Sequence, residues 1–206
     1  DRVGLVIKVD EGKQYFLRNI TWVGNSIYPT SLLDRALNIE KGSIYNKTLL
    51  NKRLKLEEDA VSSLYLDNGY LFSDLTPVEV NVVGDSVDIE VRIYEGDQAY
   101  LNDIIISGNT RTNEHVARRE LYTLPGDLFS KENILRSVRQ LGVLGHFDPE
   151  KINPQPIPDP MNGTVDLLYK LEERANDQFE ISGGWGAGML VGTVGVRFNN
   201  FAMRNF

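Results

Sequence analysis

The sequence contains no cysteine and only two histidines. Without cysteine the chain can form neither a disulfide framework nor a thiolate metal site. His115 stands in a polar helical run and His146 in a turn, and no HExxH motif accompanies them. Metal and nucleophile chemistry therefore have few groups to use, and the acidic run Glu57–Asp59 is interpreted as a solvated helix face rather than an acid/base pair. We expect no enzyme activity, no catalytic residue, no metal and no cofactor.

Long apolar runs and clustered cationic residues are also missing. No stretch of about 18 apolar residues occurs, so no segment is predicted to cross a bilayer as a helix. Lysine and arginine number 22 against 29 acidic residues, which gives a net charge of −7. No basic face could neutralise a row of phosphates, and this argues against nucleic acid as a partner. With 41% apolar and 25% charged residues, the composition is that of a globular protein.

The feature that organises the chain is an internal repeat. Three markers of the first half recur 84 residues later: Glu11-Gly12 as Glu95-Gly96, Gly24-Asn25 as Gly108-Asn109, and Gly42 as Gly126. Further along, Asn68-Gly69-Tyr70 corresponds to Leu144-Gly145-His146 at a spacing of 76, so the first copy carries about eight extra residues, which we place in its second helix. The repeat predicts two modules, residues 13–96 and 97–174.

Each module is predicted to run strand, helix, helix, strand, strand. Alternating apolar residues stop at each Gly-Asn pair and predict the first strand, and residues 29–37 and 114–122 predict the first helices. Asn46 and Ser130 are expected to cap the second helices, because a short side-chain oxygen can accept from a free amide of the first turn. The predicted fold class is α+β, a three-stranded sheet covered on one face by two helices.

A hairpin closes each predicted module. The first covers residues 78–93, and the second covers 151–171 with a turn at Asn162-Gly163. The opening strand of the second hairpin carries alternate prolines, which restrict it to a sheet edge. Val3–Val9 resembles the closing strand of these hairpins, so residues 1–12 are expected to be the closing strand of a preceding module in a longer chain.

After Arg174 the composition shifts towards glycine and apolar residues. Alternation over roughly 9–11 residues, with aromatics near the ends, is typical of transmembrane β-strands. We expect residues 175–206 to begin an outer-membrane β-barrel with its first β-hairpin; a soluble glycine-rich hairpin fits the pattern equally well. A phosphate-binding loop fits less well, because a strand rather than a helix follows the glycines. The residues predicted to face the membrane are Phe179, Ile181, Trp185, Leu190, Val194, Val196 and Phe198.

The order of these features resembles the polypeptide-transport-associated (POTRA) modules of the Omp85 superfamily. The likeness covers almost the whole chain, and it is specific because of the order of the motifs rather than any one of them. The residues that carry it are Gly24-Asn25, Gly108-Asn109, Arg118–Leu121, Leu141–Phe147 and Val165–Arg174 with the glycine-rich strand that follows.

The resemblance implies a location and a set of partners. It places residues 13–96 and 97–174 as the penultimate and last POTRA modules before the barrel, in the periplasm of a protein of the cell outer membrane. It implies unfolded outer-membrane protein precursors as the main partner, with accessory outer-membrane lipoproteins, periplasmic chaperones and, through the barrel, the lipid bilayer. The implied function is β-barrel assembly, the folding and insertion of such precursors.

Two surfaces are candidates for these contacts. An exposed sheet edge can accept an incoming strand through main-chain hydrogen bonds, so the precursor-binding candidates are Val78, Val80, Val82, Lys151 and Asn153. A covered or merely solvated edge is an equally good reading of each. The resemblance implies a lipoprotein contact at Arg118, Arg119 and Glu120, with a solvated helix face as the alternative. Relatives can carry an acidic residue where this chain has Pro125, which places any ion pair there in doubt.

Two other functions remain open from the sequence. The chain could belong to a related Omp85-type transporter that serves translocation, secretion or autotransporter assembly. It could also belong to a POTRA scaffold that makes protein contacts without assembly activity. The glycine-rich tail argues against the scaffold.

Overall fold

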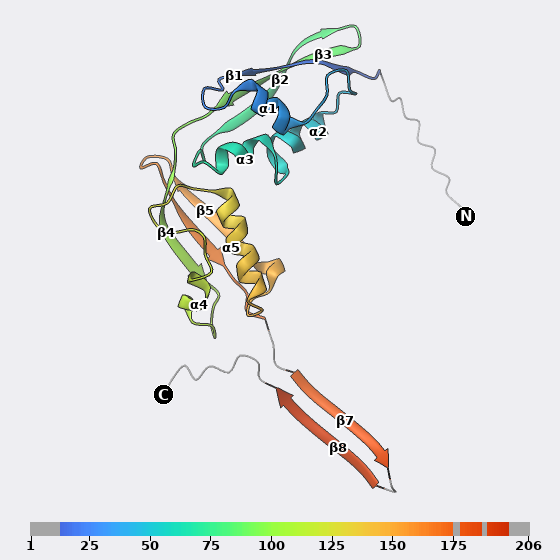
Figure 1. Cartoon of the computed structure of the whole chain (residues 1–206), viewed down its shortest axis with the longest axis vertical. Helices are drawn as coiled ribbons and strands as arrows, with labels where there is room; N and C mark the ends of the chain where they lie inside the picture. The colour runs from blue at the N-terminus through green and yellow to red at the C-terminus, as the bar shows by residue number, and fades with distance from the viewer. Residues whose placement is uncertain (1–12, 175–177, 187–188, 198–206) are drawn as a thin grey trace, which may run out of the picture. The chain divides into compact units, whose positions relative to one another are not determined.

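The computed structural model describes residues 13–174, 178–186 and 189–197 (Figure 1). The chain divides into two compact units: the first ends at Gly96 and the second begins at Asp97, except that Leu66–Leu71 belongs to the second. The predicted closing strand in residues 1–12 and the predicted membrane-facing Phe198 lie outside the described residues. No helix within the described part of the chain is long and apolar enough to cross a membrane.

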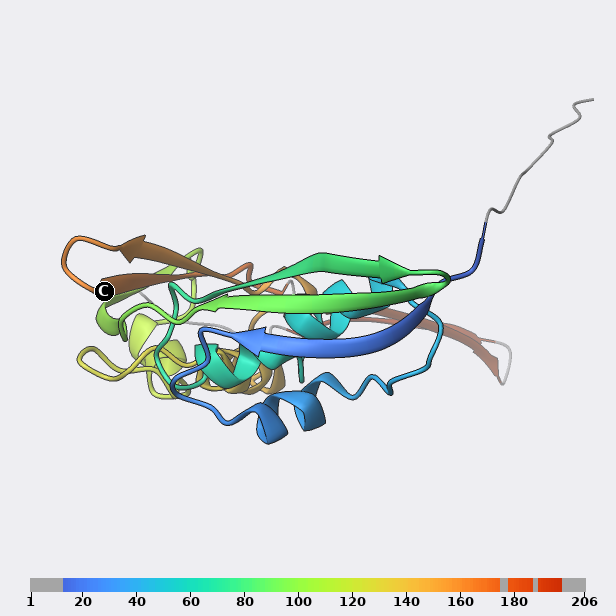
Figure 2. The same cartoon turned by 90° about the horizontal axis from the view of Figure 1, so that it is seen from above.

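The first unit is a three-stranded sheet with helices on one face (Figure 2). Its strands are β1 (Phe16–Val23), β2 (Asp74–Val83) and β3 (Ser86–Tyr94), in the order β1-β3-β2. β1 runs parallel to β3, and β2 runs antiparallel to it. Its helical segments are α1 (Thr30–Leu37), α2 (Lys47–Asn51), the π-helical turn η1 (Lys52–Leu56) and α3 (Val61–Leu66).

The second unit repeats this topology. Its strands are β4 (Tyr100–Ser107), β5 (Asn153–Asp159) and β6 (Thr164–Lys170), in the order β4-β6-β5. Its helical segments are α4 (Glu114–Arg118), α5 (Lys131–Val143) and the 3-10 turn η2 (Pro149–Lys151). β4 is parallel and β5 antiparallel to the central β6, so the predicted α+β fold of two related modules is confirmed.

The third sheet is a separate hairpin. β7 (Gln178–Gly186) and β8 (Met189–Arg197) pair antiparallel, from Gln178 opposite Arg197 to Gly186 opposite Met189. The predicted strand pair after the second module is therefore present.

The core of each unit lies between the central strand and the helices. Along β3 the side chains of Val87, Ile89, Val91 and Ile93 are buried, and along β6 those of Val165, Leu167 and Tyr169 are buried. Successive side chains of a strand point to opposite faces, so burial at every second residue means that one face of each sheet is covered. These two central strands are the closing strands of the predicted hairpins.

Both predicted N-caps are confirmed. The side chain of Asn46 accepts a hydrogen bond from the amide of Leu49 at 3.0 Å, and that of Ser130 accepts one from Asn133 at 3.2 Å. Each bond satisfies an amide that has no partner inside the helix, which fixes where the second helix starts.

The extra residues of the first module do not extend one helix, so that expectation is wrong. The backbone becomes extended at Glu57 and helical again at Val61. Arg53 favours this break, because its guanidinium donates to the carbonyls of Leu37 (3.0 Å) and Ala36 (2.7 Å) and pairs with Glu57 and Asp59. These bonds tie the end of α1 to the chain after η1. The predicted helix 114–122 is also shorter than expected, since α4 ends at Arg118.

One glycine in each unit lies where the first strand leaves the sheet. Gly24 and Gly108 have φ of +92° and +91°, a region that side chains disfavour. A Cβ at Gly24 would overlap the carbonyl oxygen of Ile93, and one at Gly108 would overlap that of Leu171. The close approach of two backbones requires glycine at both positions.

We predict that Gly24→Ala lowers the free energy of unfolding by at least about 2 kcal/mol, because it adds a backbone overlap to an unfavourable φ. Gly42→Ala is the matched control: Gly42 has φ +83° and open space around its Cβ position, so it should cost only about 1 kcal/mol. Urea unfolding of both variants measures the difference. Equal losses would show that the approach to Ile93 is not tight.

Candidate functional site

The outer edge of β2 is open. Among the described residues β2 pairs only with β3, and no main-chain hydrogen bond joins it to any other described segment. Val80 is 47% exposed and Val82 is 52% exposed. β2 therefore presents unpaired N–H and C=O groups beside exposed apolar side chains, an arrangement to which an extended peptide can add as a further strand.

The opposite edge of the same sheet is partly covered. The segment Gly42–Tyr45 lies along the start of β1, where the amides of Leu17 and Gly42 bond the carbonyls of Ser43 (2.8 Å) and Leu17 (2.6 Å). The amide of Tyr45 also donates to the carbonyl of Tyr15 at 2.8 Å. These bonds occupy edge positions of the first strand, so β2 offers the more open of the two edges.

The three valines predicted for this edge all lie on β2. Val78 is half-buried, Val82 is exposed, and Val80 falls at the irregularity where the register with β3 shifts between Glu79 and Asn81. Such a bulge leaves one residue unpaired and increases the local twist of the strand. The edge is thus divided into a segment before Val80 and a shorter one after it.

A concavity of about 260 Å³ lies beside the first of these segments. It is lined by Tyr45, Lys47, Leu50, Pro77, Val78, Glu79 and Ile89. The Tyr45 hydroxyl donates to Glu79 at 2.8 Å, and the Lys47 ammonium lies 3.9 Å from the same carboxylate. Burial and the bond to Glu79 raise the pKa of Tyr45, so this hydroxyl remains a proton donor. Side chains of an added strand would contact the apolar residues of this concavity, with the charged groups of Lys47 and Glu79 beside them.

The corresponding edge strand of the second unit is β5, which is poorer in donors. Its seven pairs with β6 run from Asn153 opposite Lys170 to Asp159 opposite Thr164 without a register shift. Pro154, Pro156 and Pro158 occupy alternate positions, so their missing N–H groups all face the same edge. Because the hydrogen-bond ladder between β5 and β6 is continuous, the prolines must face the outer edge of β5, away from β6. β5 can accept hydrogen bonds from an incoming strand but donates few.

Lys151 does not lie on this strand, contrary to the prediction, whereas Asn153 begins it. Lys151 ends the 3-10 turn η2, and its ammonium pairs with Glu172 and lies 3.9 Å from Asp148. Pro149 is the first residue of the turn, where the fixed φ of proline matches the helical backbone. Asp148 caps the turn, because its carboxylate accepts a hydrogen bond from the amide of Glu150 at 3.2 Å. This local capping delays the strand by two residues.

The residues predicted to contact an accessory protein lie on and just after α4. The Arg118 guanidinium donates to the carbonyl of Ile104 at 3.0 Å and pairs with Glu114. Arg119 pairs with its neighbour Glu120 at 3.0 Å. Arg118 therefore fastens α4 to β4, whereas the side chains of Arg119 and Glu120 pair with each other.

A carboxylate closes each unit at the end of its central strand, a feature that the sequence analysis did not identify. Glu95 accepts from the hydroxyl of Ser26 and from the amide of Ile27 at 3.0 Å. Glu173 accepts from the hydroxyl of Thr110 at 2.7 Å and from the amides of Arg111 and Thr112 at 2.8 and 2.5 Å. We call these two arrangements the carboxylate clasps. A signal for this pair is present in the sequence: if the alignment of Val87–Ile93 with Val165–Leu171 is extended by two residues, Glu95 aligns with Glu173.

Each clasp holds the loop that follows the Gly-Asn pair. In the same loops, the side-chain amides of Asn25 and Asn109 donate to the carbonyls of Tyr28 (3.0 Å) and Thr112 (3.1 Å). Burial raises the pKa of Glu173, but the hydrogen bonds from Thr110, Thr112 and Arg111 outweigh it and leave the pKa below its usual value. The ionised form is therefore favoured in the folded unit.

We predict that Glu173→Gln lowers the free energy of unfolding at neutral pH by about 1–2 kcal/mol, because a charged acceptor is replaced by a neutral amide. Since the folded pKa lies below the unfolded one, the contribution of Glu173 is complete above the unfolded pKa. It disappears as the pH falls through the folded pKa, so the wild-type and variant stabilities should converge in acid. Urea unfolding at several pH values measures this convergence.

The matched control is Glu172→Gln, the neighbouring exposed carboxylate that pairs with Lys151. A surface pair of this kind contributes at most about 1 kcal/mol. A loss for Glu173→Gln that is no larger than the loss for Glu172→Gln, or that persists unchanged in acid, would contradict the role assigned to the clasp.

The predicted membrane-facing residues stand opposite one another in the hairpin. The register pairs Phe179 with Val196, Ile181 with Val194 and Trp185 with Leu190. Directly opposite residues of an antiparallel pair share a face, and so do residues at even spacing along a strand, so Ile181, Trp185 and Val194 form one stripe. The side chains of Ile181, Trp185 and Val194 are 80%, 78% and 75% exposed. Such a stripe of exposed large apolar side chains marks a surface made for contact with an apolar phase or a partner.

Comparison with known proteins agrees with this architecture. The family model POTRA, described as a surface antigen variable number repeat, matches residues 15–96 and 99–174. The chain therefore belongs to the POTRA family.

Individual relatives cover nearly the whole chain. A Treponema pallidum (strain Nichols) protein provisionally named an outer membrane protein assembly factor is 30% identical over 87% of this chain and 21% of its own length. The outer membrane protein assembly factor BamA of Neisseria meningitidis serogroup B is 28% identical over 94% of this chain and 24% of its own. The chain thus spans less than a quarter of the length of these relatives.

Solved structures show the same fold. The crystal structure of Haemophilus influenzae BamA POTRA3-5 superposes with a TM-score of 0.67 at 20% identity, covering 79% of this chain and 63% of that one. At this identity the comparison concerns the fold alone, and it agrees with the tandem three-stranded modules.

Proposed function

We propose that this chain is the POTRA region of an outer-membrane protein assembly factor and that it receives unfolded β-barrel precursors by strand addition at β2. The observation that carries the proposal is the open edge of β2, with exposed Val80 and Val82 beside a concavity. A β-barrel precursor is a chain of alternating apolar and polar residues. Such a chain suits an edge that bonds the main chain of any sequence and offers an apolar surface to alternate side chains.

The proposal assigns each part of the chain a place. Residues 13–96 and 97–174 are the penultimate and last modules on the periplasmic side of the outer membrane. Residues 175–206 start the barrel, and the apolar stripe of β7 and β8 faces lipid. Two relatives are named for outer membrane protein assembly, which supports the assembly-factor part of the proposal.

The chain acts by binding in this proposal, not by catalysis. Unfolded precursors bind at β2. The complete protein then folds the precursor into the outer membrane. Arg119 and Glu120 form a contact for an accessory lipoprotein, with Arg118 holding the helix that presents them. The donor-poor β5 serves as a weaker second edge.

We predict that Val80→Pro reduces cross-linking of the first unit to an unfolded β-barrel precursor while the unit stays folded. Proline removes a main-chain donor and is tolerated in edge strands at bulges, where Val80 lies. Site-specific cross-linking from residue 82 measures the capture, and circular dichroism with urea unfolding verifies the fold.

Val80→Ala is the matched control, because it changes the same exposed side chain but keeps the main-chain N–H. It should leave capture by the first unit unchanged. If Val80→Pro captures precursor as well as the unaltered protein does, strand addition at β2 is wrong.

The assignment of the hairpin leads to a further prediction. A chain that ends at Arg174 should remain soluble without detergent, because it lacks the exposed stripe of β7 and β8, whereas a chain that ends at Phe206 should aggregate or require detergent. Size-exclusion chromatography of both in plain buffer tests this. Identical monomeric elution would contradict the membrane assignment of the hairpin.

A further inference from the structure

The tip of the hairpin formed by β5 and β6 carries an Asn-Gly pair in an exposed loop. Residues 160–163 connect Asp159, the last residue of β5, to Thr164, the first residue of β6. Asn162 is exposed, and Gly163 follows it with a φ of +65°. In an Asn-Gly pair the amide nitrogen of the glycine can attack the side-chain carbonyl of the asparagine, because no Cβ hinders the approach.

The two groups that would react at this tip are not engaged by the fold. In the part of the chain that the structure describes, the Gly163 amide donates no hydrogen bond, and the side-chain oxygen of Asn162 accepts none. The side-chain nitrogen of Asn162 donates to Asp159 at 2.6 Å. The Gly163 carbonyl accepts from the Tyr100 amide at 3.1 Å, so the fold fixes Gly163 through its carbonyl alone.

The chain contains one other Asn-Gly pair, which the fold holds differently. Asn68-Gly69 lies in the glycine turn Leu66–Leu71 of the second unit. The Asn68 carbonyl accepts from the side-chain amide of Gln98 at 2.9 Å, and the Gly69 carbonyl accepts from the Ala99 amide at 2.8 Å. Gly69 is buried. The backbone rotation that attack on the Asn68 side chain requires is therefore hindered.

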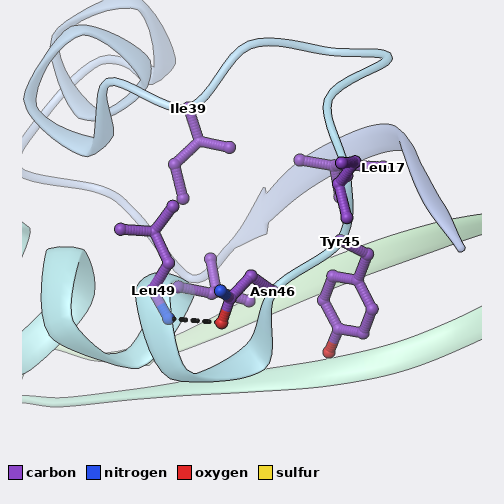
Figure 3. A pocket seen from close by; sticks show the side chains of 7 residues that line it. Leu17, Ile39, Tyr45, Asn46 and Leu49 are labelled. Carbon is purple, nitrogen blue, oxygen red and sulfur yellow. Dashed lines mark hydrogen bonds between the residues drawn. The ribbon is translucent and has the colours of Figure 1, made fainter. Parts of the chain in front are cut away.

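Asn46 provides a third arrangement. Figure 3 shows Asn46 in the wall of a small pocket, where its side-chain oxygen accepts from the Leu49 amide at 3.0 Å. This cap directs the side-chain carbonyl toward the helix. The next residue is Lys47, whose side chain hinders attack by its own amide. Asn46 is therefore an internal reference for an asparagine that reacts slowly.

We propose that Asn162 is a site of spontaneous deamidation and that this modification opens the hairpin tip. The Gly163 nitrogen bonds to the side-chain carbonyl carbon of Asn162, and the side-chain nitrogen leaves as ammonia with the proton of the glycine amide. Water then opens the succinimide ring at either carbonyl, which leaves aspartate or isoaspartate at residue 162. The reaction consumes water alone and requires no oxidant. The proposal is independent of strand addition at β2.

The product cannot keep the contacts of the present tip. The bonds from the side chain and amide of Asn162 and from the Met161 amide hold the pKa of Asp159 below its usual value. A carboxylate at residue 162 would therefore face an ionised carboxylate at Asp159, and repulsion would replace a hydrogen bond. Isoaspartate would also lengthen the main chain between Asp159 and Thr164, which stand opposite each other.

The test uses the complete natural protein in detergent, incubated at neutral pH and physiological temperature. Peptide mass spectrometry follows the conversion of Asn162, Asn68 and Asn46 to aspartate or isoaspartate. A sample unfolded in urea shows what the fold contributes, since the two Asn-Gly pairs should react at similar rates there. Asn162→Gln is the matched variant, because glutamine would have to close a larger ring and reacts more slowly.

We expect the folded protein to deamidate at Asn162 several-fold faster than at Asn68, with no conversion of Asn46 over the same period. Backbone hydrogen exchange should become faster at residues 160–164 and at Tyr100 as the protein ages, and Asn162→Gln should show no such change. Conversion of Asn162 no faster than that of Asn68 would overturn the assignment of the site. Conversion that leaves exchange at the tip unaltered would overturn the proposed opening.

Discussion

The close approach of two backbones at the end of each central strand is the constraint on which the rest depends. Gly24 and Gly108 admit the carbonyls of Ile93 and Leu171, and two residues beyond these carbonyls Glu95 and Glu173 bind the same loops. The clasps hold the first strand of each unit against the closing strand, which runs parallel to it and is distant from it in the sequence. Parallel pairing of this kind requires a long crossover, and the helices of the crossover then cover one face of the sheet. The other hairpin strand is left at the edge.

In this arrangement the unit's own chain covers part of one edge of each sheet, and the other edge is open among the described residues. The edge of the first strand is used by the loop after α1 and, in the second unit, by the glycine turn Leu66–Leu71. Among the described residues, the outer edge of the first hairpin strand, β2 or β5, has no main-chain partner. Its properties differ between the units: β2 has exposed valines, a bulge and a concavity, while β5 has three outward prolines. The same fold thus provides one edge with exposed apolar side chains and one edge that is poor in main-chain donors.

The features that sequence analysis predicted correctly are those set by local chemistry. The closing hairpins at residues 78–93 and 151–171 and the caps at Asn46 and Ser130 each depend on a few adjacent residues. The features it missed depend on contacts between distant residues. The interrupted second helix requires Arg53 to reach the end of α1, and the clasps require Glu95 and Glu173 to meet loops about 60 to 70 residues away. The displacement of Lys151 from its strand follows from Asp148 and Glu172.

The most direct measurement of the central claim is hydrogen exchange of the backbone amides with and without a peptide of alternating apolar and polar residues taken from a transmembrane β-strand. Addition of this peptide to β2 would place its main chain against the outer edge, and amides that face that edge would then be hydrogen-bonded. The account predicts slower exchange within residues 74–83 and little change within β5. Peptide binding that leaves exchange in β2 unchanged would contradict it.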